Sequence, residues 1–190
     1  MTELEIKAYV DDRTSLVKRL NEIAIYKGHV TREDFYYRRE GVKTYPLRIR
    51  KETQNGICKI LLTYKRKKIR KGKDNIDIEV NDERECVLSS SDVLEAFFED
   101  NKVDLYLKKE KIVDDWEYKG HIEVLGDYKA TLELCTIPNL GDFLEIEILS
   151  NENNENILQN VHKELERLLE MSGISKSRIE NRSYAQLLKG

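Results

Sequence analysis

The sequence is poor in cysteine, proline and glycine. Cys58, Cys86 and Cys135 lie far apart without a Cys-x-x-Cys pair, which argues against a zinc knuckle, and we interpret all three as small buried hydrophobic residues. An odd number of cysteines suits a reducing compartment, so we expect a cytoplasmic protein. Only 2 prolines and 9 glycines in 190 residues argue against a disordered chain.

Several familiar functional signals are also missing. No apolar run approaches the roughly 18 residues of a membrane span, and the first ten residues carry acids where a secretory signal has an apolar core, so we expect no membrane partner. The histidines are scattered, which gives no support to a histidine metal site or a Ser-His-Asp triad. Because neither GxxxxGK[ST] nor GxGxxG occurs, a bound phosphate would be held by side chains instead of a glycine-rich loop.

Charge is abundant and nearly balanced. Charged residues make up 36% of the chain, with 33 basic and 36 acidic residues, and the net charge of −3 argues against a nucleic-acid partner. The exception is segment 59–73, which is rich in lysine and arginine and contains no acid until residue 74. An electrostatic nucleic-acid patch is the competing interpretation there. We interpret residues 68–73 as a solvated hairpin tip, because no aromatic platform is interleaved.

Period-2 alternation of apolar and polar residues dominates the chain and predicts mainly β structure. The predicted strands are 3–10, 34–39, 46–52, 56–67, 75–87, 103–113, 121–124, 130–135 and 143–149. Helices are predicted at 14–24, 92–99, 156–171 and 183–188. Asn55-Gly56 between two alternating runs is a hairpin signal. We see no repeat and no boundary, so residues 1–190 are expected to form a single domain.

Charged side chains share one face of each predicted strand. Glu3, Glu5 and Lys7 alternate with Leu4 and Ile6. The same pattern recurs at Arg48 and Arg50, at Lys65, at Glu83 and Glu85, at Lys109 and Lys111, and at Glu145 and Glu147. For any one strand, exposure of the charged face to solvent explains the pattern. If the helices cover the apolar face and the sheet curls into a barrel, however, every charged face lines the interior.

An ionic interior requires partners, because buried charges are costly unless they are paired or bind ions. Rows of arginine and lysine match phosphate oxygens. Carboxylates at i and i+2 match a hard divalent cation, Mg²⁺ or Mn²⁺. A ligand that needs both is a polyphosphate or a nucleoside triphosphate.

Ordered motifs along the whole chain resemble the CYTH superfamily, the triphosphate tunnel metalloenzymes. The N-terminal Glu3-x-Glu5-x-Lys7 is similar to the family's ExExK signature. Further matches are DFYY from residue 34, LRIR from 47, LTYK from 62, LGDFLEIE from 140 and SYAQLL from 183. The DFYY and SYAQLL segments, together with the E-x-E at Glu83 and Glu85, look most like the class IV adenylyl cyclase branch.

The resemblance implies a fold and a set of roles. The implied fold is α+β and mainly β, an eight-stranded antiparallel closed β-barrel with helices packed on the outside. The implied metal ligands are Glu3, Glu5, Glu133, Glu145 and Glu147. The implied triphosphate-binding residues are Lys7, Arg48, Arg50, Lys65, Lys109 and Lys111, with Glu83 and Glu85 orienting them. Lys65, Glu5 and Glu147 are the implied catalytic residues.

Two positions depart from the family pattern, and two details stay open. Lys111 stands where the family usually has arginine, which removes a bidentate fork, and Glu133 stands where aspartate is usual. A bulge would turn Lys108 inward instead of Lys109. Segment 113–130 is interpreted either as a lid at the tunnel mouth or as an ordinary extended hairpin.

The expected activity is metal-dependent chemistry on a triphosphate, with Mg²⁺ or Mn²⁺ as cofactor. A class IV adenylyl cyclase, converting ATP to cyclic AMP and pyrophosphate, is the first interpretation. A triphosphatase acting on inorganic tripolyphosphate or thiamine triphosphate is the alternative, and a polyphosphate-binding module without turnover is the third. Some tyrosines and leucines are expected on the outer surface, so a homodimer stays an open alternative.

Overall fold

The computed structural model describes residues 2–41, 46–71, 77–150 and 154–189. Its strands are β1 Thr2–Tyr9, β2 Ile25–Arg39, β3 Leu47–Gln54, β4 Ile57–Lys71, β5 Asp77–Leu88, β6 Val103–Ile122, β7 Gly126–Ile137 and β8 Gly141–Ser150. Its helices are α1 Arg13–Ile23, α2 Asp92–Asp100, α3 Glu155–Met171, the 3₁₀ turn η1 Lys176–Arg178, and α4 Tyr184–Leu187. None of the helices in these ranges is long and apolar enough to cross a membrane.

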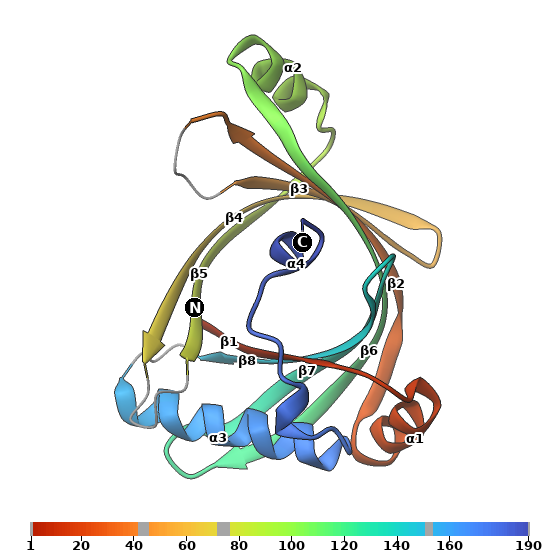
Figure 1. Cartoon of the computed structure of the whole chain (residues 1–190), viewed down its shortest axis with the longest axis vertical. Coiled ribbons are helices and arrows are strands. Elements are labelled where there is room, and N and C mark those ends of the chain that lie inside the picture. The colour runs from red at the N-terminus through yellow and green to blue at the C-terminus, as the bar shows by residue number, and fades with distance from the viewer. Residues whose placement is uncertain (1, 42–45, 72–76, 151–153, 190) are drawn as a thin grey trace.

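The strands form one antiparallel sheet that curves around an interior (Figure 1). Their order is β5-β4-β3-β2-β6-β7-β8, and β1 pairs with both β8 and β5. The β1–β8 ladder runs from Thr2↔Ser150 to Tyr9↔Phe143. The β1–β5 ladder is short, from Thr2↔Asp82 to Leu4↔Val80. The expected mainly-β, eight-stranded antiparallel architecture is therefore present.

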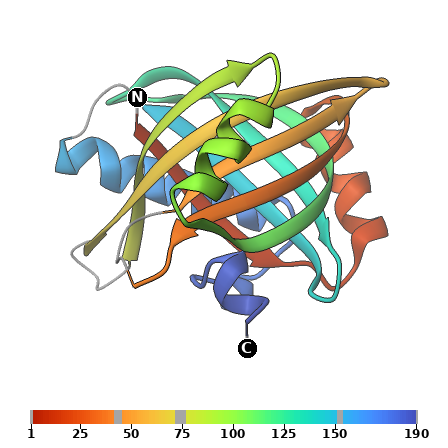
Figure 2. The same ribbon diagram turned by 90° about the horizontal axis from the view of Figure 1, so that it is seen from above.

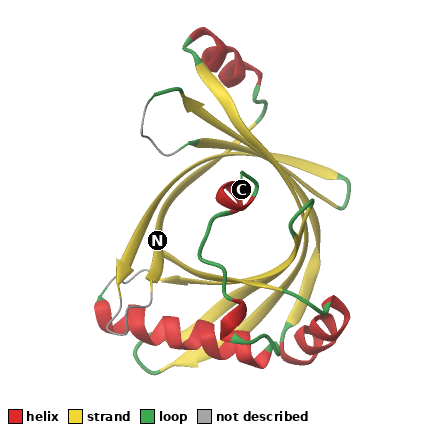
Figure 3. Ribbon diagram, in the orientation of Figure 1, coloured by secondary structure: helices red, strands yellow, loops and turns green. Residues whose placement is uncertain are grey.

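The main hydrophobic core lies between the outer face of the sheet and two helices (Figure 3). Leu4, Ile6 and Ala8 of β1 point into this core, which leaves the alternate residues of β1 on the interior face. Apolar residues of α3, such as Val161 and Leu165, are fully buried against the sheet. The side chains of Asp12 and Asn154 accept hydrogen bonds at the first turns of α1 and α3, which fixes where both helices begin.

The hairpin predicted at Asn55-Gly56 is confirmed, and both turn residues have the positive φ that it requires. Asn55 has φ 51° and Gly56 has φ 78°, and Gln54 pairs with Ile57 across this turn. These angles are those of the two-residue turn that matches the twist of the flanking strands. Predicted turn residues 72–74 and part of the predicted tip 68–73 lie outside the described residues.

Two predicted strands are much longer in the structure. The segments 103–113 and 121–124 belong to the single strand β6, and β2 begins at Ile25 instead of residue 34. The segment 113–130 is a regular extended hairpin, because β6 and β7 stay paired from Ile112↔Thr136 to Ile122↔Gly126. Shifts in the β2–β6 register between Tyr26 and Gly28 and between Tyr36 and Tyr37 interrupt the alternation there.

The expectation that all helices pack outside the sheet is wrong for α4. Figure 1 shows α4 within the outline of the curved sheet, and Figure 2 places it at one end of the molecule. Tyr184 of α4 packs with Phe143, Val113 and Cys135 on the interior side. A capping box between Ser183 and Gln186 defines this short helix. The physical reason is that Tyr184 finds an apolar site inside the sheet.

The interpretation of all three cysteines as buried is wrong for two of them. Cys135 is buried, whereas Cys58 and Cys86 are exposed. Cys58 lies on β4 and Cys86 on β5, and neither belongs to the hydrophobic core that α1 and α3 cover. Alternation predicted their strands correctly but could not show which stretch of the outer face remains bare.

Candidate functional site

A cavity of about 760 Å³ lies on the interior face of the sheet, and all of the side chains predicted to form the site line it. These are Glu3, Glu5, Lys7, Arg48, Arg50, Lys65, Glu83, Glu85, Lys109, Lys111, Glu133, Glu145 and Glu147. Residues two apart on a strand point to the same face, and the curvature turns those faces toward one another. The structure thus brings the predicted residues together, and their roles stay predictions.

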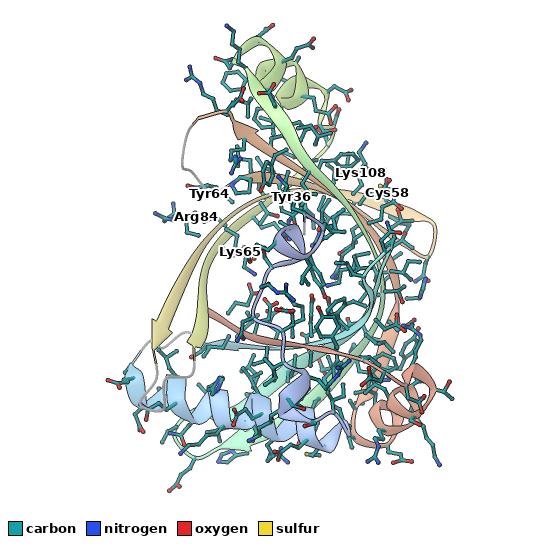
Figure 4. All side chains as sticks on the ribbon, in the orientation of Figure 1. Tyr36, Cys58, Tyr64, Lys65, Arg84 and Lys108 are labelled. Atoms are coloured by element: carbon teal, nitrogen blue, oxygen red, sulfur yellow. The ribbon has the colours of Figure 1, made fainter. Side chains whose placement is uncertain are left out.

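Lys65 is the centre of one ionic cluster, and Figure 4 shows its side chain directed into the interior. Its Nζ lies 2.7 Å from an oxygen of Glu3, 3.5 Å from Glu5 and 3.5 Å from Glu83. Burial lowers the pKa of Lys65, but the three carboxylates outweigh this and raise it above its usual range. Lys65 is therefore a firmly charged cation that links β4 to β1 and β5.

Carboxylates crowd the edge between β1 and β8. Glu5 and Glu147 are direct cross-strand partners. Burial raises the pKa of Glu3 to about 9, an effect that Lys65 opposes and that Glu5 and Glu147 strengthen. Burial also raises the pKa of Glu5, but Lys65 and a hydrogen bond from Glu3 outweigh it and bring the pKa to about 2. Glu3 and Glu5 thus share one proton.

Glu147, like Glu3, has a raised pKa. Burial and the neighbouring charge of Glu5 raise the pKa of Glu147 to about 7, although Lys65 opposes them. At Glu3 and Glu147, burial and the neighbouring carboxylates outweigh the positive charge of Lys65. The β1–β8 edge therefore holds more carboxylate charge than its cations balance, and hard oxygen donors in this situation suit a divalent cation.

Lys111 forms a second cluster with the other two predicted metal ligands. Its Nζ lies 2.8 Å from Glu133 and 2.5 Å from Glu145. Arg32 donates from Nη1 to both oxygens of Glu133, at 2.8 and 2.9 Å, and from Nε to Glu52 at 2.7 Å. Burial raises the pKa of Glu133, but Lys111 and Arg32 outweigh it and hold the pKa below its usual range.

Glu133 and Glu145 also belong to a group that meets the geometry of a metal site. Together with Cys135, each offers one ligand atom within 4.8 Å of the others. Burial raises the pKa of the Cys135 thiol, so the thiol stays protonated and is a poor ligand. Lys111 Nζ already fills the role of the cation between the two carboxylates. Of the two acidic groups, the β1–β8 edge fits a divalent ion better.

Asp34 is a fully buried carboxylate that sequence reasoning did not assign to the site. Arg50 donates to it twice, at 2.6 and 3.1 Å, and Lys109 Nζ lies 3.0 Å away. Burial raises the pKa of Asp34, yet Lys109 and Arg50 outweigh it and hold the pKa well below its usual range. Asp34 therefore fixes two of the predicted phosphate-binding cations in position.

The ambiguity between Lys108 and Lys109 is resolved in favour of Lys109. Lys109 is buried and contacts Asp34. Lys108 is exposed, contacts Glu33 and Glu110 at 3.0 and 3.1 Å, and is labelled on the outside in Figure 4. The register shift near Tyr36 lies beyond this point and does not turn Lys108 inward.

Arg48 retains hydrogen-bonding capacity. Its Nη2 donates to Thr63 and Glu83, both at 3.1 Å. Its Nε is buried and has no hydrogen-bond partner among the described residues. A buried donor without a partner is costly in a folded protein unless a ligand or water satisfies it.

The C-terminal segment reaches into the cavity at one end. Ser183, Tyr184 and Ala185 line it. Lys7 Nζ donates to the backbone oxygen of Arg182 at 2.5 Å and lies 4.4 Å from the centre of the Tyr184 ring. Lys109 Nζ lies 5.0 Å from the same ring. Two predicted phosphate-binding cations therefore contact this segment.

Sequence reasoning missed Arg32, Asp34 and Tyr184 as site residues. For Arg32 and Asp34 a signal existed: they occupy alternate positions of β2 together with Tyr36, and all three share the interior face. Figure 4 shows Tyr36 directed to the interior. For Tyr184 no periodic signal existed, because its place depends on how the terminal segment folds back.

A second cavity of about 580 Å³ adjoins the first. Thr131, Glu147 and Leu149 line both cavities. Asp115 and Glu117 of β6 line the second one alone. Burial and the charge of Glu133 raise the pKa of Asp115 to about 6. The extended β6–β7 hairpin thus prolongs the interior beyond the ionic clusters.

The comparisons with known proteins agree with this architecture. The family model of the CYTH domain matches residues 1–184. No curated protein matches the chain. The solved structure of PH1819 from Pyrococcus horikoshii is similar, with a TM-score of 0.74, 23% identity and 98% of each chain covered.

Two further solved structures share the fold. One is a Vibrio parahaemolyticus protein with a provisional adenylate cyclase assignment, at a TM-score of 0.70 and 18% identity over 100% of this chain and 99% of that one. The other is HpAC1 from Hippeastrum, a provisional adenylyl cyclase described as having a dominant triphosphatase activity. It matches at a TM-score of 0.65 and 14% identity over 99% of this chain and 94% of that one.

Proposed function

The chain belongs to the CYTH domain family, and from this premise we propose that it is a divalent-metal-dependent enzyme that acts on a triphosphate bound in the cavity of about 760 Å³. The observation that carries the proposal is the convergence of lysine, arginine and glutamate rows from separate strands onto this one cavity. Cations alone would suit many anions. Cations beside an excess of carboxylates suit a polyphosphate that arrives with a metal ion.

Closure of the sheet into a tunnel is part of this proposal. The short β1–β5 ladder supports it, because β1 then has a hydrogen-bonded neighbour on each side. A closed sheet excludes bulk water from the ionic clusters, and charges act more strongly on one another where water is excluded. The family resemblance implies the same tunnel.

The phosphates would be held by the cations of β1, β3, β4 and β6. Arg48 and Arg50 offer planar forks that match phosphate oxygens, and Arg48 Nε is a donor that lacks a partner among the described residues. Lys65 bridges the Arg48 side of the cavity and the carboxylate edge, through its contacts to Glu83 and Glu3. These cations now pair with carboxylates, so binding would exchange one set of ion pairs for another.

The carboxylates of the β1–β8 edge would hold Mg²⁺ or Mn²⁺. Glu3, Glu5 and Glu147 fit the ion, because they are hard oxygen donors, and burial together with their mutual repulsion raises the pKa of Glu3 and of Glu147. When bound, a divalent ion supplies Lewis-acid polarisation of phosphate oxygens and neutralises charge at the reacting phosphorus. Glu133 and Glu145 would join the site as Lys111 turns from them toward the phosphates.

A class IV adenylyl cyclase reaction is the first proposed activity. The ribose 3′-oxygen of ATP forms a bond to the α-phosphorus, the bond from that phosphorus to the bridging oxygen breaks, and pyrophosphate leaves. The proton of the 3′-hydroxyl would pass to a carboxylate of the β1–β8 edge, and the divalent ion held there would make this hydroxyl more acidic. Lys65, Arg48 and Arg50 would stabilise the charge of the departing pyrophosphate.

A triphosphatase is the second candidate, with water attacking the terminal phosphorus of tripolyphosphate or thiamine triphosphate. The same cations and carboxylates serve this reaction. HpAC1 is described as a provisional adenylyl cyclase with a dominant triphosphatase activity. This description favours retaining the triphosphatase as the second candidate. The two reactions differ in which phosphorus lies beside the β1–β8 carboxylates.

Product analysis separates the candidates. The protein is incubated with Mg²⁺ or Mn²⁺ and with ATP, thiamine triphosphate or tripolyphosphate in turn, with EDTA as the control. Cyclic AMP plus pyrophosphate supports the cyclase, and free phosphate supports the triphosphatase. Tight tripolyphosphate binding without any product supports a binding module and rejects the enzyme. Absence of both turnover and binding would reject the whole proposal.

A further inference from the structure

The lining of the interior changes character where the two cavities meet. Along β8 the inward residues run Glu145, Glu147, Leu149. Leu149 is 50% exposed, although Glu147, the residue before it in this row, is ionic. Leu125 also lines the second cavity. A half-exposed leucine at the junction offers apolar contact to a ligand that extends past the carboxylates.

The second cavity has a size that suits a small organic group. Its volume of about 580 Å³ falls within the roughly 300–1,000 Å³ of typical ligand pockets. A bare tripolyphosphate bound between the cations would leave this space unused. Its charged wall includes an internally satisfied pair, since Lys129 contacts Glu117 at 3.0 Å.

Asp115 is the polar group of this cavity that lacks a partner. Its Oδ1 is buried and has no hydrogen-bond partner among the described residues. Asp115 pairs with Glu133 across β6 and β7. Glu133 already accepts from Arg32 and Lys111, so these two donors are engaged, and Lys27 is a further cation in the lining of this cavity. An acceptor left in this state is costly unless a ligand or a water satisfies it.

A metal ion does not explain Asp115 well. A divalent cation takes several oxygen ligands in proteins, commonly six or more when waters are included. Both oxygens of Glu133, the cross-strand neighbour of Asp115, accept hydrogen bonds from Arg32, and one also accepts from Lys111. One acceptor without a partner calls for one donor.

We propose that the second cavity binds the organic group of the triphosphate substrate, and that Asp115 Oδ1 accepts a hydrogen bond from an amino group on a heterocycle. The chemical class is an amino-substituted base joined to a triphosphate, and Leu149 contacts its non-polar part. This inference rests on the proposed function and narrows it to organic triphosphates. Asp115 is then a specificity residue, outside the reacting centre.

The test compares an organic with an inorganic substrate in matched variants. Asp115→Leu keeps the approximate side-chain size and removes both oxygens. Asp104→Leu removes an exposed aspartate on the same strand, outside both cavities. The value of kcat/KM is measured with tripolyphosphate and with ATP or thiamine triphosphate, whichever the wild type uses better. Circular dichroism and Tm confirm that each variant is folded.

The expected result is selective. Asp115→Leu lowers kcat/KM for the organic triphosphate by at least about tenfold, in line with the loss of one buried hydrogen bond. Tripolyphosphate stays within about twofold, and Asp104→Leu changes neither. If ATP is the substrate, purine riboside triphosphate, which lacks the amino group, is already weaker for the wild type and loses nothing further in Asp115→Leu.

Two outcomes would overturn the inference and leave the proposed function intact. One is equal loss on organic and inorganic substrates, and the other is no loss on either. Absence of any turnover or binding of triphosphates would instead overturn the proposed function, and this inference with it.

Discussion

Single residues of the interior are held in place by ion pairs, and Asp34 shows what such a pair requires. It is fully buried and forms ion pairs with both Arg50 and Lys109. Removing one partner of a buried ionic cluster leaves uncompensated charge, which costs about 3–5 kcal/mol. Asp34 therefore stabilises the fold and at the same time positions two cations for a ligand.

Replacing Asp34 by asparagine should destabilise the protein in a pH-dependent way. The pKa of this carboxyl is lowered by folding, so its contribution is present above the unfolded pKa of about 3.9 and is lost as pH falls through the lower folded value. We expect Asp34→Asn to lower the free energy of unfolding by about 3–5 kcal/mol at pH 7. The gap should narrow as pH falls from about 5 toward 2.

Urea unfolding across this pH range measures the effect of Asp34→Asn. The exposed Asp104→Asn is the control and should track the wild type. A gap that is absent at neutral pH, or that stays constant down to pH 2, contradicts the assignment.

At Glu147 we expect a substitution that raises stability and lowers activity. Folding raises its pKa to about 7, so its charge opposes folding increasingly as pH rises from about 4.5 to 7. Glu147→Gln removes that charge and should raise Tm at pH 8. The same change should lower triphosphate turnover by at least about 100-fold, because a metal ligand is lost.

Turnover and Tm are measured on the same preparations of Glu147→Gln and of the exposed control Glu99→Gln. Full activity in Glu147→Gln would reject its role in the site.

At the scale of elements, the sequence predicted what has local causes. The bounds of α1, α2 and α3 lie within one residue of their expected positions, because apolar spacing and, at α1 and α3, side-chain caps are local signals. The first half of β2 and the middle of β6 escaped prediction. Gly28 and the β2–β6 register shifts break the alternation, and Trp116 packs on one face of β6 beside charged neighbours.

The candidate site, too, was predicted where the signals are local and missed where they are long-range. The charged faces of β1, β3, β4 and β8 were visible as alternation, and they do converge on one cavity. The partners of those charges were not visible, because Asp34–Lys109 or Arg32–Glu133 depends on register and curvature between distant strands. The place of α4 depends on a long-range fold-back of the terminal segment.

The element α4 should depend chiefly on the ring of Tyr184. This ring packs at 5.1 Å from the Phe143 ring and lies over Lys7 and Lys109. Tyr184→Ala is expected to cost about 3–5 kcal/mol, as for other large buried rings. Tyr184→Phe keeps the ring and should cost less than about 1.5 kcal/mol.

Equilibrium unfolding of the two Tyr184 variants against wild type tests the anchor. Equal stabilities for alanine and phenylalanine would show that α4 is not held by this ring.

At the scale of the whole molecule, the interior combines two sets of charge that are only partly matched to each other. The β1–β8 edge has surplus carboxylate, whereas Arg48 keeps a buried donor without a partner among the described residues. A metal ion and a polyanion that enter together would satisfy both. Ligands that bind only the folded state stabilise it by mass action.

Thermal stability should therefore respond to the two ligands jointly. Mn²⁺ and tripolyphosphate together are expected to raise Tm by several degrees more than the sum of their separate effects. The reason is that each ligand supplies the charge that the other lacks. Differential scanning fluorimetry with each ligand alone, with both, and with both plus EDTA measures this, and strictly additive shifts would contradict joint binding.

The most direct measurement of the central claim is a crystal structure grown with Mn²⁺ and a non-hydrolysable triphosphate analogue, with anomalous data to locate the manganese. The account predicts the triphosphate along Arg48, Arg50 and Lys65, and a manganese peak in direct contact with carboxylate oxygens of Glu5 and Glu147. Triphosphate bound on the outer surface, or manganese away from the β1–β8 edge, would contradict it.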